Sequence, residues 1–403
     1  MNEKFTKLYE LALKDLTENL LPWWMTTAVD NENGGWYGEV NNDDKPVAHA
    51  PKFITLNARL VWTFSSAYRI LGDEKYKEMA DRAYDYFIKH FWDDRYDMCH
   101  TYVDEFGKPI DSHRYIYGNA FAVYGLSEYA RATGSEEALD YARKLVAALE
   151  KYAYDPEYKG YYEALTEQCK YSPWLRGVNR FPTDVKTMNN HLHLIEAYTC
   201  HLRSEKTNFM QSKVREHLYV MLNKIVDHDI HHYFVFQDRA WKPTSTEISY
   251  GHDIEGSWLM METAEVLGEP EALRYTRDVC VNIARTCLEQ GLTEDGAMKT
   301  EYDPATGHAS KYLSWWEQNE AVVGFLNAWE LTGEEKFLDA SLKSMEFALE
   351  HFVDHEKGGW YTGTTLDGKT IVTKQKSNGY TCPYHNARMH MEIIERYRKH
   401  LEK

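Results

Sequence analysis

The sequence predicts an all-α fold, an (α/α)6 barrel in which six helical hairpins close a ring and short strands lie at one rim. The first observation is a repeat marked by glycines, each of which ends an apolar helical pattern and precedes acidic residues typical of a helix start. These glycines are Gly72, Gly134, Gly268 and Gly333, with successive spacings of 62, 134 and 65 residues. The long middle gap holds two periods, one of them degenerate near His201. A period near 65 residues divides the chain of 403 residues into about six hairpins.

The second observation is the character of the helices that lead into these turns. Their apolar residues are not confined to one stripe, which is typical of helices packed on two sides, so we expect them to form the inner ring. The helices that follow the turns, such as 74–90 and 334–351, alternate charged with apolar residues and are expected to lie half exposed on the outside. The expected inner helices span 57–71, 119–133, 188–201, 253–267, 317–332 and 385–400.

The third observation concerns the two ends of the repeat. Gly34-Gly35-Trp36-Tyr37 near the start recurs as Gly358-Gly359-Trp360-Tyr361 near the end, which favours a closed ring. An open superhelix of the same hairpins is the alternative. We expect Gly-Trp-Tyr and Gly-Tyr-Tyr clusters of this kind to form the short strands at the rim.

Composition favours one large domain over residues 1–403, because 43% of the residues are hydrophobic, 27% are charged and no linker divides the chain. The first residues lack the apolar core of a signal peptide, and no apolar run reaches membrane-spanning length, so we expect a cytoplasmic protein without a membrane partner. A net charge of −17 argues against nucleic acid as a partner. Six cysteines without metal-ligand spacing indicate reduced thiols and no metal site. We expect a monomer or a homodimer.

Polar and charged residues recur at matching positions of the inner helices, where packing alone favours apolar side chains. The layer 13 residues before each glycine, or at the equivalent position of a helix without one, comprises Arg59, Asn189, Glu255, Glu320 and Arg388. The layer one turn nearer the helix start comprises His252, Glu317 and His385. Taken singly, each residue has a structural explanation, such as helix capping or an ion pair between Arg59 and Glu320. Buried charges are costly unless paired or functional, so the two layers together indicate a site at the mouth where the inner helices begin.

His252 and His385 occupy the same phase of two repeats. Two imidazoles at one level suit proton shuttling, because one removes a proton and the other returns it from the other side. Glu255 follows His252 by three residues on one helix face, so we expect its carboxylate to orient the imidazole. A metal held by His252 and Glu255 is the less favoured interpretation. His191 and His193 are two residues apart and point to different helix faces, so they do not form a metal-binding pair.

Five strings in chain order carry a resemblance that runs along nearly the whole chain. They are Asn57-Ala58-Arg59-Leu60-Val61-Trp62, Met188-Asn189-Asn190-His191-Leu192-His193-Leu194-Ile195-Glu196-Ala197-Tyr198, Ser249-Tyr250-Gly251-His252-Asp253-Ile254-Glu255, Trp315-Trp316-Glu317-Gln318-Asn319-Glu320-Ala321-Val322-Val323-Gly324-Phe325 and Cys382-Pro383-Tyr384-His385-Asn386-Ala387-Arg388-Met389. Together they resemble the N-acylglucosamine 2-epimerase superfamily, and within it the cellobiose 2-epimerases and D-mannose 2-epimerases. The fold of that family is an (α/α)6 barrel.

The resemblance implies epimerisation at C2 of a reducing aldose through an enediol or enediolate, with a sugar as the small-molecule partner and no cofactor. It implies that His252 and His385 are the acid/base pair, one for each face of C2, and that His193 binds ring or open-chain oxygens. Arg59 would stabilise the developing oxyanion, and Glu255 would orient His252. The expected substrate-binding residues are Tyr117, Asn189, Trp315, Trp316, Glu320, Tyr380 and Arg388.

Two departures from the cellobiose 2-epimerase pattern bear on the substrate. Tyr380 stands where that group has a tryptophan that packs against sugar, and the stretch 171–177 differs from the group's loop. Both changes favour a monosaccharide, D-glucose or D-mannose, over a disaccharide such as cellobiose. A ketol isomerase, which protonates the enediol at C1 to give fructose, would use the same residues.

Two other classes of protein remain as alternatives. An inverting glycoside hydrolase on an (α/α)6 barrel would use two carboxylates such as Glu255 and Glu320 with a water between them. A sugar-binding protein without catalytic activity would keep the aromatic residues, which make up 14% of the chain, but has no need of paired histidines.

Overall fold

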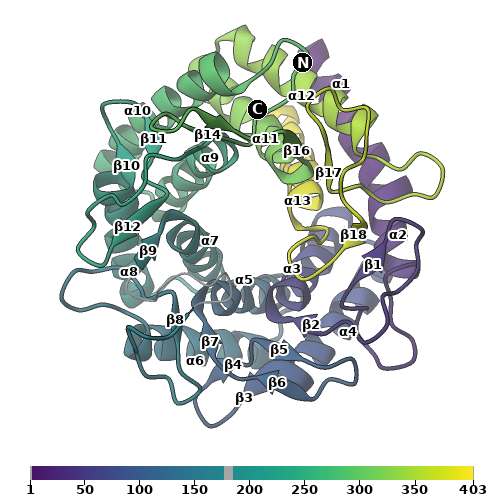
Figure 1. The fold of residues 1–403 in the computed structure, drawn as a ribbon, viewed down its shortest axis with the longest axis vertical. Helices are drawn as coiled ribbons and strands as arrows, with labels where there is room; N and C mark the ends of the chain where they lie inside the picture. The colour runs from purple at the N-terminus through teal and green to yellow at the C-terminus, as the bar shows by residue number, and fades with distance from the viewer. Residues whose placement is uncertain (1, 177–184, 403) are drawn as a thin grey trace.

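The computed structural model describes residues 2–176 and 185–402. In this part of the chain, six helices form an inner ring in which consecutive helices are neighbours and the last contacts the first, so the ring is closed (Figure 1). The inner helices are α3 (Ile54–Leu71), α5 (Ile116–Thr133), α7 (Met188–Ser204), α9 (Tyr250–Leu267), α11 (Trp315–Thr332) and α13 (Tyr384–Leu401). The predicted (α/α)6 barrel is confirmed, and the open superhelix is wrong.

An outer layer of helices packs around this ring. It consists of α1 (Glu3–Asp15), α4 (Glu74–Phe91), α6 (Glu136–Tyr152), α8 (Asn208–Val220), α10 (Pro270–Thr286) and α12 (Glu335–His351). The N-terminal helix α1 packs against both α12 and α13, so the start of the chain completes the outer layer beside its end. Short extensions are α2 (Leu21–Thr26) and three π-helical turns, η1 (Leu16–Leu20), η2 (Met221–Ile225) and η3 (Cys287–Gly291).

The four predicted glycines end inner helices as expected. Gly72, Gly134, Gly268 and Gly333 all have φ between 72° and 76°, a left-handed conformation that glycine adopts without a steric penalty. The degenerate repeat corresponds to α7, which has no terminal glycine. Its last turn is followed by Glu205 in an extended conformation, which does not require glycine. The other inner helices begin one to three residues before the predicted starts, and α3, α5, α9 and α11 each follow a rim strand directly.

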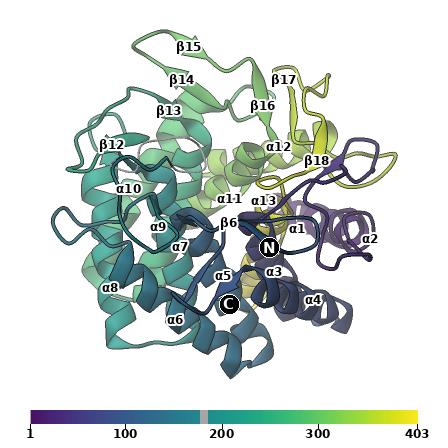
Figure 2. The ribbon, with the colours of Figure 1, turned by 60° about the horizontal axis from the view of Figure 1, so that its bottom comes forward.

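Short strands lie at the end of the barrel where the inner helices begin, and Figure 2 shows β13 to β18 rising above that end. Strands that lead into inner helices are β2 (Lys52–Phe53), β7 (Arg114–Tyr115), β9 (Val185–Thr187), β13 (Ile248–Ser249), β16 (Tyr312–Ser314) and β18 (Gln375–Ser377). The others are β1 (Val40–Asn41), β3 (Trp92–Asp93), β4 (Met98–Cys99), β5 (Tyr102–Val103), β6 (Pro109–Asp111), β8 (Ala164–Leu165), β10 (Val226–Asp227), β11 (His232–Tyr233), β12 (Phe236–Asp238), β14 (Glu301–Asp303), β15 (His308–Ala309) and β17 (Gly363–Thr365). Antiparallel pairing of β1 with β18 joins the two ends of the repeat.

The Gly-Trp-Tyr clusters do not form these strands, which corrects the prediction. Trp36 and Trp360 instead make isolated bridges to Val29 and Val353 across tight turns. The glycines before each tryptophan have positive φ, so the chain reverses there and cannot continue as a strand. Across residues 2–176 and 185–402, no helix is long and apolar enough to cross a membrane.

Candidate active site

A cavity of about 270 Å³ opens at the end of the barrel where the inner helices begin, and we call it the upper cavity. Four of the predicted site residues line it, namely Tyr117, Asn189, His252 and Trp316. The N-terminal ends of the inner helices converge on this end. Helix N-termini carry partial positive charge, so the geometry favours negative charge that develops on a bound molecule.

His252 lies in the first turn of α9, at the wall of the upper cavity. Its Nδ1 is 2.7 Å from the hydroxyl of Ser249, and its ring centroid is 4.6 Å from that of Trp316. Burial, and to a smaller extent the nearby His193, lowers the pKa of His252 to about 3. His252 is therefore a neutral imidazole at neutral pH.

His385 lies in the first turn of α13 and is 6% exposed. Its Nδ1 is 2.7 Å from Oε1 of Glu320, and its ring centroid is 5.5 Å from that of Trp316. Burial lowers the pKa of His385 well below its usual value, and the guanidinium groups of Arg59 and Arg388 act in the same direction. Two neutral imidazoles from different helices thus contact one tryptophan ring.

Arg59 is buried beside the histidines and is held by neutral groups. It donates hydrogen bonds to the hydroxyl of Tyr117 at 2.7 Å and to the carbonyl of Tyr380 at 3.1 Å. Its guanidinium carbon lies 4.1 Å from the ring centroid of Phe121 and 4.3 Å from that of Tyr384. None of the ion pairs among the described residues involves Arg59, so its pairing with Glu320 is excluded. Its positive charge remains available to an oxyanion.

Arg388 occupies the centre of the buried cluster below the histidines. One guanidinium nitrogen donates to Oε1 of Glu255 at 2.5 Å and to Oε1 of Glu320 at 2.7 Å. The other binds Glu196 and the hydroxyl of Tyr384. Arg388 is 1% exposed. The carboxylates that Arg388 holds in place surround its guanidinium, and the contact of Arg388 with substrate stays a prediction.

Glu255 does not make the predicted contact with His252. Its carboxylate binds Arg388, and its Oε1 lies 3.9 Å from Nδ1 of His385. The spacing of three residues places His252 and Glu255 on one side of α9, but the imidazole lies at the rim, where Ser249 binds it, and the carboxylate lies deeper. Glu255 therefore supports His385 on α13 instead.

Glu196, Tyr384 and Trp258 belong to this cluster although the sequence argument did not select them as site residues. Glu196 accepts a hydrogen bond from Nδ1 of His193 at 2.9 Å, and Trp258 donates to Glu320 at 3.0 Å. Helical spacing was an available signal, because Glu196 follows His193 by three residues and Tyr384 precedes Arg388 by four.

Trp315 and Tyr380 lie around the histidines in different ways. Trp315 is 9% exposed and packs edge-on against His385, with ring centroids 6.3 Å apart, so it supports the imidazole from outside the upper cavity. The half-buried ring of Tyr380 lies 5.0 Å from Phe53 and 6.4 Å from Tyr117. In the stretch 171–177, Tyr171 stacks on Tyr162, whereas Gly177 lies outside the described residues.

Glu255, Glu320 and His385 form the one described group whose spacing suits a metal, with ligand atoms within 4.8 Å of one another. The guanidinium of Arg388 already binds both carboxylates and supplies the positive charge that a cation would bring. The carboxyl oxygens of Glu255 and Glu320 lie within 4.8 Å of each other. This distance disfavours an inverting hydrolase, in which two carboxyl groups about 6.5–9.5 Å apart leave room for a water.

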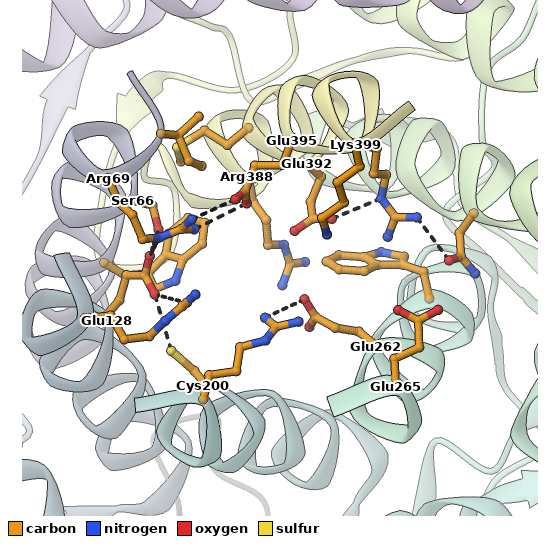
Figure 3. A pocket seen from close by; sticks show the side chains of 18 of the residues that line it. Ser66, Arg69, Glu128, Cys200, Glu262, Glu265, Arg388, Glu392, Glu395 and Lys399 are labelled. Carbon is orange, nitrogen blue, oxygen red and sulfur yellow. Dashed lines mark hydrogen bonds and ion pairs between the residues drawn. The ribbon is translucent and has the colours of Figure 1, made fainter. Parts of the chain in front are cut away.

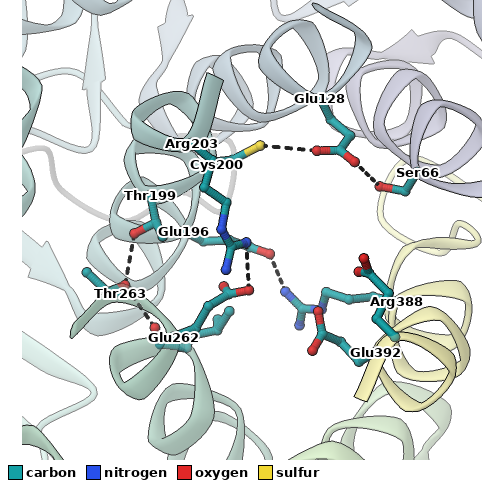
Figure 4. Close-up of polar contacts among 12 residues, drawn as sticks. Ser66, Glu128, Glu196, Thr199, Cys200, Arg203, Glu262, Thr263, Arg388 and Glu392 are labelled. Atoms are coloured by element: carbon teal, nitrogen blue, oxygen red, sulfur yellow. Dashed lines mark hydrogen bonds and ion pairs between the residues drawn. The ribbon is translucent and has the colours of Figure 1, made fainter. Parts of the chain in front are cut away.

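A second cavity, of about 800 Å³, lies at the opposite mouth, where the inner helices end. Figure 3 shows that charged side chains cover its wall, and most of them pair with each other. Arg69 bridges Glu128 and Glu395, and Arg203 binds Glu262 on the neighbouring helix (Figure 4). Arg388 lines this cavity as well, so its guanidinium lies between the two mouths. We call this the lower cavity.

The model of the family described as N-acylglucosamine 2-epimerase (GlcNAc 2-epimerase) matches residues 34–388. The chain belongs to this family. As a member of the N-acylglucosamine 2-epimerase family it is an epimerase, an enzyme of the isomerase class. It is 39% identical to cellobiose 2-epimerase of Bacteroides fragilis, over 94% of this chain and 97% of the relative.

Solved structures agree with the family assignment. Cellobiose 2-epimerase from Bacillus thermoamylovorans has a TM-score of 0.92 and 33% identity, covering 97% of this chain and 100% of the other. A D-mannose isomerase shares the fold, with a TM-score of 0.82 at 16% identity, over 97% and 98% of the two chains.

Proposed function

We propose that the protein epimerises a reducing aldose at C2 by removing the proton next to the carbonyl group and returning one to the opposite face. One observation carries this proposal: His252, which lines the upper cavity, and His385, on another inner helix, are both neutral and lie against the same ring of Trp316. A neutral imidazole is free to accept a proton, and two of them on different helices provide the two faces that epimerisation needs.

The surroundings of the two imidazoles suit complementary roles. The Nδ1–H of His385 donates to Glu320, which leaves Nε2 as the base, and the carboxylates of Glu320 and Glu255 stabilise the imidazolium that forms. His252 is neutral in the resting site, so it takes up a proton from solvent before it gives one to the opposite face of C2, and His385 releases its proton to solvent afterwards. With only the neutral hydroxyl of Ser249 at Nδ1, His252 returns readily to the neutral form once that proton is given up. In the reverse reaction the two histidines exchange roles.

Removal of the C2 proton places negative charge on the carbonyl oxygen, and Arg59 is the group that meets it. Its charge is not neutralised by a carboxylate, and Tyr117 and the carbonyl of Tyr380 fix its guanidinium. Preorganised positive charge in a site that excludes water is an effective stabiliser of an oxyanion. His193, held by Glu196, lies beside Tyr117 and is assigned to the sugar oxygens during ring opening.

Substrate choice is tested with sugars of one and two rings. Cellobiose 2-epimerases among the relatives support a disaccharide with a reducing glucose, whereas Tyr380 in place of tryptophan supports a monosaccharide. The experiment incubates the protein in D₂O with D-glucose, D-mannose, cellobiose and mannobiose, and follows C2 by NMR. We expect the C2 epimer of at least one sugar, labelled with deuterium at C2.

Each other outcome of this experiment has a distinct meaning. Absence of deuterium at C2 of every sugar would overturn the proposal. Fructose as the main product would assign protonation at C1 and therefore a ketol isomerase. Cleavage of a nonreducing glycoside, measured in parallel, would assign a hydrolase.

A further inference from the structure

The upper cavity is lined by carboxyl groups without matching cations. Glu163, Glu247, Glu301 and Glu317 line it, and none of its described lining residues is Lys or Arg. His252 is neutral at neutral pH because burial lowers its pKa. The described wall of the cavity therefore carries four carboxyl groups and no lysine or arginine.

Two of these carboxyl groups have a structural role that explains their position. Glu317 forms a capping box with Ser314 at the start of α11, and Glu163 accepts hydrogen bonds from the backbone and hydroxyl of Thr187. Burial raises the pKa of Glu163 to about 7 and that of Glu317 to about 8, so both are at least partly protonated near neutral pH.

Glu247 and Glu301 have no such role. Glu247 directly precedes β13 and Glu301 lies in β14, so neither caps a helix. Glu301 is the strand partner of Ser249, whose hydroxyl binds His252, and both residues line the upper cavity. His308 lies 3.6 Å from Glu301 but is largely exposed to solvent.

Unsatisfied hydrogen-bond acceptors in the same wall point to a bound molecule. Asn190 is 1% exposed and Asn189 is half-buried, yet the Oδ1 atom of each has no hydrogen-bond partner. A buried polar atom without a partner is costly, so a ligand that supplies donors is favoured. Hydroxyl and ammonium groups supply donors, whereas a fully ionised phosphate or carboxylate supplies only acceptors.

We propose that Glu247 and Glu301 make the upper cavity a charge filter, which admits neutral and ammonium-bearing reducing sugars and rejects sugars that carry phosphate or carboxylate. This inference rests on the proposed function for the identity of the ligand as a sugar. It also places the reaction before any phosphorylation of the same sugar, because a phosphoryl-transfer enzyme would have to act on the released product.

Three sugars that differ at C6 test the filter: 6-amino-6-deoxy-D-glucose, D-glucose and D-glucose 6-phosphate. Their dissociation constants are measured by ligand-observed NMR, which does not require turnover. We expect the amino sugar to bind most tightly and the phosphate at least about ten-fold more weakly than the amino sugar at low ionic strength, and high salt should reduce that difference.

A double variant, Glu247→Gln with Glu301→Gln, separates charge from size. It should bring the affinities for the amino sugar and the phosphate together and leave that for D-glucose within about two-fold, since a neutral sugar loses little from the removal of charge. The matched control, Glu136→Gln with Glu271→Gln, changes net charge equally at exposed positions of α6 and α10 and should keep the original order.

The results distinguish the filter from the proposed function. Equal or tighter binding of the phosphate by the unaltered protein, or an unchanged order in the double variant, overturns the filter even if glucose is epimerised. The predicted order of affinities without any C2 exchange retains the filter and overturns the epimerase proposal.

Discussion

At the residue scale, the site divides into charges that the protein balances and one that it leaves unbalanced. Arg388 binds three carboxylates, Glu196, Glu255 and Glu320, and all four side chains are buried. Burial and the proximity of Glu320 raise the pKa of Glu255 well above its usual value, which the guanidinium of Arg388 opposes. Arg59 has only neutral partners. The cluster therefore fixes geometry, whereas Arg59 is the group that we propose to meet the oxyanion.

Replacement of either histidine tests the assignment of one base to each face. His252→Asn and His385→Asn should each reduce kcat/KM for epimerisation by at least about 100-fold, because each removes one proton-transfer group. Each variant should still exchange the C2 proton of one epimer with D₂O, since the remaining histidine serves one face. NMR measures exchange and epimerisation in the same sample.

The exposed His113, replaced in His113→Asn, provides the control and should leave both rates unchanged. If one histidine variant kept near-normal epimerisation, the assignment of two bases would be wrong. Circular dichroism checks that each variant keeps its helices.

The sequence predicted which residue types gather at the mouth, but not all of their contacts. His252 and His385 do lie near one ring, because repeat phase fixes the height of a side chain in a regular barrel. Glu255 binds a different partner from the expected one, since a contact between helices depends on how each helix is rotated about its axis. Asn189 was placed in the layer of Arg59, yet it lines the upper cavity, because α7 has no terminal glycine to fix the alignment.

At the element scale, close contacts between inner helices depend on glycines inside the helices and not only at their ends. A Cβ atom at Gly125 of α5 would lie 2.6 Å from the carbonyl oxygen of Ala58 and 3.2 Å from Cβ of Val61, both on α3. The terminal glycines were predictable because a turn and an acidic start surround them. Gly125 was not, since nothing in its local sequence indicates which helix it will face.

Gly125→Ala should therefore push α3 and α5 apart. A backbone carbonyl cannot move aside as a side chain can, so we expect a loss of at least about 2 kcal/mol in the free energy of unfolding, within the range for an overpacked core. Gly333→Ala is the comparison, because its Cβ would meet nothing within 4 Å and only the positive φ opposes it, at a cost of about 1 kcal/mol. Urea unfolding measures both, and equal losses would contradict the packing argument.

At the scale of the whole molecule, closure joins the two ends of the chain at both mouths. At the upper mouth β1 pairs with β18, and at the lower mouth Arg69 of α3 binds Glu395 of α13 at 2.7 Å. The recurrence of Gly-Gly-Trp-Tyr predicted closure correctly, although the strands that pair, β1 and β18, follow these clusters in the sequence and are not the clusters themselves. The ion pairs of the lower cavity were not predictable, because charged residues near helix ends are common on ordinary exposed surfaces.

Removal of Arg69 tests the lower closure. Arg69→Gln leaves Glu128, which is 1% exposed, with Arg131 as its remaining cation, and leaves Glu395 without Arg69. We expect a loss of about 2 kcal/mol in the free energy of unfolding, below the usual cost of a broken buried ion pair because Arg69 is 25% exposed. Lys77→Gln, which breaks the surface pair with Asp81, should cost at most about 0.5 kcal/mol. Equal losses would show that the lower ion pairs do not close the barrel.

The stability of the whole fold should also report a buried histidine that takes no part in the site. His217 of α8 packs between the rings of Tyr161 and His191, and neither of its ring nitrogens has a hydrogen-bond partner. Burial lowers its pKa well below the usual value, and His191 contributes. The folded protein thus keeps His217 neutral, whereas the unfolded chain protonates it below about pH 6.5. Its contribution to stability is present above that pH and is lost as the pH falls.

His217→Gln should therefore be less stable than the unaltered protein at pH 7.5, and the difference should shrink by about 2 kcal/mol at pH 5. The change follows from the proton that only the unfolded wild-type chain gains at this position, at about 1.4 kcal/mol for each pH unit below 6.5. Val214→Ala, a buried position on the same helix without a titratable group, should show the same loss at both pH values. Urea unfolding at the two pH values gives both differences, and a constant difference for His217→Gln would mean that the folded protein protonates this histidine too.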